Sequence, residues 1–98
     1  MAEAERTFPP ESVVERCPEV AYEILDGEAV LFHEGTGEVH VLNHTATFIW
    51  QAFDGESRVS DVVAHLSRLA GVSYPVIEAD VLATLQDFRN LGLVRAFP

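Results

Sequence analysis

The chain has no lysine, and this absence bears on the partners that it can bind. Its 98 residues contain six cationic side chains, all arginine, against 16 carboxylates, which gives a net charge of −10. Affinity for nucleic acid is built largely from cationic contacts with phosphates, so this balance disfavours a nucleic-acid partner. It favours a neutral or basic partner, whose encounter with the protein the negative charge assists.

Disulfides and membrane-spanning segments are also missing from the sequence. The single cysteine, Cys17, has no second cysteine with which to form an internal disulfide, which makes the cytosol the expected compartment. No apolar run approaches the ~20 residues that span a bilayer, and the N-terminus lacks the charged start and apolar core of a signal peptide. We therefore expect a soluble, cytoplasmic protein that does not contact a membrane.

The first part of the chain differs in composition from the rest. Residues 1–19 are charged and contain three prolines and few large apolar side chains. This composition predicts a flexible N-terminal arm. The remaining residues, 20–98, are enough for one domain near the lower limit of what a hydrophobic core can stabilise unaided.

Three short runs after the arm have the composition of β-strands. Asp26-Gly27 separates the first two and is a tight hairpin signal, and a turn with Gly35 and Gly37 separates the last two. Loops this short predict an antiparallel meander. No strong strand follows to pair with the third, so its outer edge is expected to be free. The predicted strands are 20–25, 28–33 and 38–42.

Three helices are expected next, each with apolar residues at helical spacing. Asn43 can cap the first helix by accepting a hydrogen bond from its first turn, and Ser73 followed by Pro75 marks the start of the third. The order predicts an α+β, winged-helix-like fold with a three-stranded antiparallel sheet before three helices, and a short C-terminal tail that packs back. The predicted buried residues are Ala46, Ile49, Trp50, Phe53, then Val59, Val62, Val63, Leu66, Leu69, Ala70, then Ile77, Val81, Leu85 and Phe88, with Thr84 and Leu91 beside the last group.

No group of residues has the spacing that catalysis or metal binding requires. His33 and His40 are expected two residue pairs apart on adjacent strands, and His44 and His65 belong to different helices without a suitable second ligand. Cys17 has no neighbouring base to activate it. We therefore expect no enzymatic activity, no metal and no cofactor.

A DNA-binding regulator is one functional alternative for such a fold. The second and third helices could form a helix-turn-helix. The third helix, however, carries Glu78, Asp80 and Asp87 against one Arg89. These carboxylates repel phosphates and make DNA a poor partner.

The free edge offers a different function, the binding of an extended peptide. A peptide can add as a strand beside Glu38–Leu42, with the third helix flanking it. Leu82 lies off the main apolar stripe and is a candidate for lining this groove, although an ordinary, partly exposed leucine explains it equally well. The edge could instead be covered by the N-terminal arm or by a second copy of the chain.

The order and spacing of five segments are distinctive: the Gly turn before the third strand, Leu42-Asn43, Trp50, Asp80-Val81 and Gly92-Leu93-Val94. With these segments, the sequence from Cys17 to Arg95 resembles the PqqD-like family, the small RiPP recognition elements of ribosomally synthesised, modified peptides. The resemblance implies a non-catalytic module that binds the leader of a precursor peptide as a strand beside the third strand, against the third helix. It also implies presentation of the precursor to a modifying enzyme such as a radical-SAM enzyme, a leader peptidase or a cyclase.

The resemblance also implies a set of site residues. Two of them depart from the family pattern: His40 stands where an aromatic is often found, and Thr84 is smaller than the usual apolar residue. The pathway stays open, as does the choice between a monomer and a homodimer joined through the exposed edge. A winged-helix DNA-binding regulator and a dimeric interaction module are the alternatives. The implied peptide-binding residues are Glu38, Val39, His40, Val41 and Leu42 on the edge and Asp80, Val81, Leu82, Thr84, Leu85 and Phe88 in the cleft.

Overall fold

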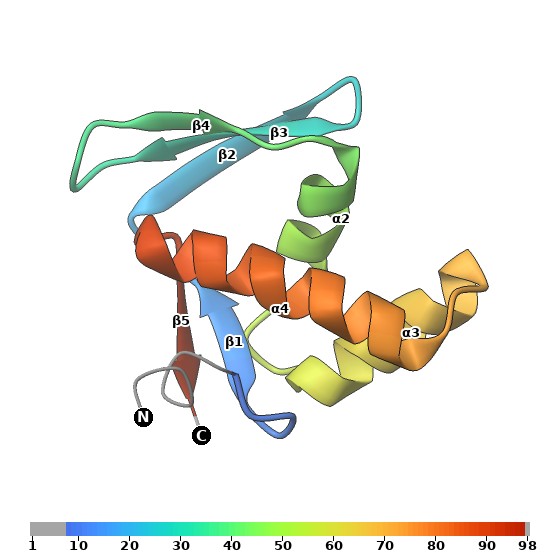
Figure 1. Cartoon of the computed structure of the whole chain (residues 1–98). Helices are drawn as coiled ribbons and strands as arrows, with labels where there is room; N and C mark the ends of the chain where they lie inside the picture. The colour runs from blue at the N-terminus through green and yellow to red at the C-terminus, as the bar shows by residue number, and fades with distance from the viewer. Residues whose placement is uncertain (1–7, 98) are drawn as a thin grey trace.

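A computed structural model of the chain describes residues 8–97 (Figure 1). These residues form an antiparallel three-stranded sheet, a separate two-stranded sheet and three helices, which confirms the predicted α+β class. The elements in chain order are β1 (Val13–Arg16), β2 (Val20–Leu25), β3 (Glu28–His33), β4 (Val39–Val41), α2 (His44–Ala52), α3 (Val59–Ala70), α4 (Tyr74–Asn90) and β5 (Val94–Phe97).

The larger sheet has the order β2-β3-β4, as the short loops predict. Asp26 and Gly27 both have positive φ, 53° and 80°, which is the backbone of a two-residue hairpin turn. In the register between β3 and β4, Leu31 lies opposite His40. β4 is an edge strand as expected, and β2 is the second edge of this sheet.

The helices cover one face of this sheet and leave the other face open (Figure 1). Ala29 and Leu31 of β3 point toward the helices and are fully buried. Trp50 of α2 lies at the centre of the core and makes edge-to-face contacts with Tyr22 of β2 and Phe88 of α4, both with ring centroids 5.6 Å apart. The core therefore lies between the sheet and the helices.

Polar contacts fix the position of α2 below the sheet. Asn43 caps the helix as predicted, since its Oδ1 accepts a hydrogen bond from the amide of Ala46 at 2.8 Å. The buried Thr47 hydroxyl accepts from the Ala29 amide at 2.8 Å and donates to the Leu42 carbonyl at 3.3 Å. One side chain thus bridges β3, the end of β4 and α2.

Residues 8–19, the described part of the predicted flexible arm, pack against the rest of the fold, so the prediction is wrong for them. β1 pairs with β5 in the two-stranded sheet, and Phe8 and Val14 are buried in the core. The Arg16 guanidinium donates to the carbonyls of Trp50 (3.1 Å) and Phe53 (2.9 Å), so it satisfies groups that the end of α2 leaves free. Residues 1–7 of the expected arm lie outside the described residues.

The C-terminal tail packs back as predicted, as β5. Because β5 pairs with β1 and not with the larger sheet, the likeness to a winged helix is loose. The predicted helix stripes are buried or half-buried, with three exceptions: Leu69 and Ala70 in the last turn of α3 and Leu91 after α4 are exposed.

Candidate functional site

The backbone hydrogen bonds that flank β4 show which of its groups are free. The amide of Leu42 donates to a β3 carbonyl at 2.8 Å, and the carbonyl of Glu38 accepts from a β3 amide at 2.9 Å. Hydrogen-bonded and non-bonded pairs alternate along an antiparallel ladder. The backbone N–H and C=O groups of the even-numbered residues of this strand therefore point toward β3. The N–H and C=O groups of Val39 and Val41 therefore point away from the sheet and offer two donors and two acceptors to another strand.

The side chains of β4 divide between the two faces of the sheet. Val39 and Val41 are 60% and 64% exposed and lie on the face away from the helices. His40 and Leu42 lie on the helix side, where Leu42 is buried in the core and His40 is half-buried. Glu38, just before the strand, is exposed.

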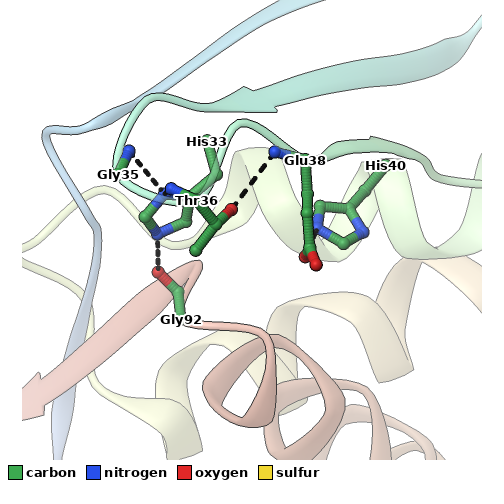
Figure 2. A network of polar contacts seen from close by, with 6 residues as sticks. All are labelled: His33, Gly35, Thr36, Glu38, His40 and Gly92. Atoms are coloured by element: carbon green, nitrogen blue, oxygen red, sulfur yellow. Dashed lines mark hydrogen bonds and ion pairs between the residues drawn. The ribbon is translucent and has the colours of Figure 1, made fainter.

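β4 and α4 run in opposite directions, with the helix below the sheet in the view of Figure 1. At one end, His33 Nε2 lies 3.1 Å from the Gly92 carbonyl oxygen and joins the β3–β4 turn to the end of α4 (Figure 2). At the other end, His44 and Asp80 line one pocket. A peptide added to the free edge of β4 would extend toward the flank of α4 that carries Asp80, and we refer to the region between the two as the candidate groove.

Contacts with the N-terminal segment identify the flank of α4 that borders this groove. The Arg89 guanidinium lies over the Phe8 ring, 4.4 Å from its centroid. Leu82 precedes Arg89 by seven residues, two helical turns, so it shares this flank. The opposite flank, on the β4 side, carries Asp80, Thr84, Asp87 and Leu91.

The structure distributes the predicted cleft residues over three environments. Val81, Leu85 and Phe88 are at most 2% exposed and belong to the core, so a peptide does not reach them in this structure. Leu82 is half-buried against the core on the flank toward Phe8 and is not brought to β4. The exposed Asp80 and the half-buried Thr84 lie on the flank of α4 opposite Leu82.

Two further residues of this flank, Asp87 and Leu91, were not among the site residues expected from the sequence. Both are exposed, and they follow Asp80 at spacings of seven and eleven residues, which place them on one flank of a helix. This helical spacing is the signal in the sequence that could have identified them. Periodicity alone does not say which of the two flanks borders the sheet edge.

A pocket of about 530 Å³ lies between α2, α3 and α4, next to the β2–β3 turn. Asp80 and Val81 line it, but no residue of β4 does. It is therefore separate from the strand edge. The lining residues are Gly27, His44, Thr45, Thr47, Phe48, Ile49, Gln51, Leu66, Leu69, Ala70, Ile77, Asp80 and Val81.

The groove is acidic because carboxylates occupy both of its walls. Glu38 lies on the strand side, and Asp80 and Asp87 lie on the helix side. Arg89 stacks on the other flank of α4, and Arg95 pairs with Glu15 at 2.7 Å, far from β4 in the fold. This surface gives no support to the DNA-binding alternative.

The described residues contain little that could carry chemistry. No three His, Cys, Asp or Glu side chains in residues 8–97 lie close enough together to hold a metal ion. Burial raises the pKa of the Cys17 thiol, which lowers its thiolate fraction and opposes a role as a nucleophile. Within the same residues, no helix combines the length and apolar character needed to cross a membrane.

The fold is shared with a solved RiPP recognition element. Residues 28–94 match the family described as Coenzyme PQQ synthesis protein D (PqqD), and the chain belongs to this family. The resemblance seen in the sequence is thus confirmed. No curated protein matches the chain.

Three solved structures share the fold over most of the chain. One is lasso peptide synthetase B1 complexed with the leader peptide (27% identity, TM-score 0.74, 87% of this chain and 98% of that one). TbiB1 in complex with the TbiA(beta) leader peptide is 24% identical (TM-score 0.78, 86% and 98%). The PqqD truncation of Methylobacterium extorquens PqqCD, a stand-alone recognition element, is 21% identical (TM-score 0.75, 93% and 98%). At these identities the last two show the fold alone.

Proposed function

We propose that this protein binds the leader of a ribosomally synthesised precursor peptide as an added strand on β4 and presents the precursor to a modifying enzyme. The observation that carries the proposal is the free edge, where the N–H and C=O groups of Val39 and Val41 point outward beside α4. Strand addition uses such groups for affinity and alternate side chains for selectivity. Membership of the PqqD family and the leader complex of lasso peptide synthetase B1 support it.

The free backbone groups alone do not give stable binding. Four hydrogen bonds at about 1 kcal/mol net each are largely offset by the roughly 2–5 kcal/mol that ordering a flexible peptide costs. Two or three apolar anchors, each about 1.5–3 kcal/mol, must supply the remainder. Leu91 and Thr84 on the α4 flank offer surface for such anchors, and the expected dissociation constant is roughly micromolar.

The chemical step belongs to a separate enzyme in this proposal, either a radical-SAM enzyme, a leader peptidase or a cyclase. A surface suited to such a partner is the sheet face opposite the helices. Solvent-facing positions of a sheet are usually polar, yet Leu25, Phe32, Val39 and Val41 on this face are all exposed. The bound leader would continue this face beside β4.

Charge favours an enzyme over a second copy of the chain on this face. Glu23 lies among the apolar residues, since it pairs with Val30, and Glu28 lies beside them. Two copies stacked on this face would bring these carboxylates together, and each chain carries a net charge of −10. A partner with an apolar patch and surrounding Arg or Lys is complementary. The proposed function would place the protein in the cytoplasm, where precursor peptides are made.

Calorimetric titration with synthetic leader peptides, taken from precursor genes beside the gene for this protein, tests the proposal. We expect one leader to bind in the micromolar range and its scrambled version not to bind. Absence of binding by every such leader would contradict the proposed function. Phe32→Glu should leave leader binding intact and impair modification of the precursor, because it changes the open sheet face on β3 and leaves the free edge of β4 unaltered.

A further inference from the structure

His40, on the helix side of the edge strand β4, carries a buried polar atom without a hydrogen-bond partner among the described residues. Its side chain is 17% exposed, and its Nε2 atom is buried. Among the described residues, no group forms a hydrogen bond with Nε2; the nearest charged group is the Glu38 carboxylate, with Oε1 at 3.4 Å (Figure 2). Buried polar atoms are usually satisfied, so this one indicates a site for a missing partner.

Strand addition places one peptide residue directly against His40. Val39 and Val41 supply the outward hydrogen bonds, so the residue opposite His40 in an antiparallel peptide forms a non-bonded pair. Side chains approach most closely in such pairs, with Cα atoms about 4.5 Å apart. This peptide side chain points toward the helices, as His40 does, and reaches Nε2 once the exposed Glu38 side chain moves aside.

We infer that His40 selects a leader with a neutral hydroxyl or amide side chain, that is Ser, Thr, Asn or Gln, at this position. The inference rests on the proposed function. An apolar side chain would leave Nε2 unpaired, as it is in the free protein, whereas a polar one would supply the missing hydrogen bond, which is expected to change affinity about tenfold.

A carboxylate is excluded by the surroundings of His40, and a cation satisfies only one tautomer of the histidine. A carboxylate would approach Glu38, which already lies 3.4 Å from Nε2. A cation could pair with Glu38 but could not accept a hydrogen bond from a protonated Nε2. A hydroxyl or an amide both donates and accepts, so it satisfies either tautomer of the histidine.

Selection from a random 12-residue peptide library, displayed on its mRNA, tests the inference without a known leader. We expect the wild-type protein to enrich Ser, Thr, Asn or Gln at one position, and His40→Phe to enrich apolar residues there. His40→Gln, which keeps a polar group, should retain the wild-type preference. His65→Phe, on the exposed side of α3, is the matched control and should also retain it.

A double-mutant cycle on one selected peptide measures the coupling. Replacing the enriched residue by an apolar isostere, such as Thr by Val, should weaken binding to the wild type about tenfold and to His40→Phe less than twofold. Equal losses for both proteins, or an apolar preference of the wild type, would overturn the inference.

The Val41→Pro variant separates this inference from the proposed function. Selected peptides that lose affinity for Val41→Pro but show no coupling to His40 would overturn the role of His40 and leave strand addition standing. If no selected peptide responds to Val41→Pro, strand addition on β4 is contradicted, and the role of His40 falls with it.

Discussion

Proline at Val41 removes one outward donor of the free edge without breaking the ladder to β3. The Val41 amide points away from β3, so the fold should tolerate the change, as edge positions do. One lost hydrogen bond of about 1 kcal/mol weakens binding roughly fivefold. Replacing Val39 as well removes the second donor and should weaken leader binding roughly 30-fold, measured by calorimetry at 25 °C.

The second edge of the sheet provides a matched control. The amide of Glu34 donates to the Glu19 carbonyl at 3.0 Å, so the backbone N–H and C=O groups of the odd-numbered residues of β2 point toward β3. The amide of Ile24, an even-numbered residue, therefore points outward. Ile24→Pro therefore makes the same change on an edge that does not border the groove. Affinities that fall equally for Val41→Pro and Ile24→Pro, or for neither, with both folds intact by circular dichroism, would refute strand addition on β4.

Four further predictions concern the fold and the alternatives. Thr47→Val should lower the free energy of unfolding by about 1–3 kcal/mol, because it leaves a buried amide and carbonyl unpaired, whereas the exposed Thr45→Val should change it little in urea titrations. Arg16→Met should lower the free energy of unfolding by a similar amount, because it keeps most of the side chain's length but loses the hydrogen bonds to the carbonyls at the end of α2. An unchanged urea midpoint would contradict this role. Cys17 should react with iodoacetamide at pH 8 more slowly in the folded protein than in urea, because its raised pKa leaves less thiolate, and equal rates would argue against that shift. Duplex DNA should show no salt-dependent binding in anisotropy titrations; a steep salt slope would revive the DNA-binding alternative.

Local signals predicted the sheet and the helix starts because each depends on few neighbouring residues. The Asp26-Gly27 turn fixes the first hairpin, and the length of the next turn places Leu31 opposite His40, as observed. The Asn43 cap needs only the amides of the following turn. Elements of this kind can be read from spacing and residue type.

Features that depend on distant pairing could not be predicted in the same way. β1 has few apolar residues of its own, and its pairing with β5 joins segments about 80 residues apart. Leu82 shows a related difficulty, because helical spacing places it off the main apolar stripe but does not say toward which neighbour it points. The packing of Phe8 against α4 shows that Leu82 lies on the flank away from β4. The groove residues Asp87 and Leu91 were missed for the same reason.

Cross-strand nuclear Overhauser effects in a complex of labelled protein and unlabelled leader peptide test the central claim most directly. The account predicts contacts between peptide backbone protons and the amide protons of Val39 and Val41, together with shifts at Thr84 and Leu91 on α4. Contacts at the β2 edge instead, or shifts confined to the pocket between α2, α3 and α4, would contradict it.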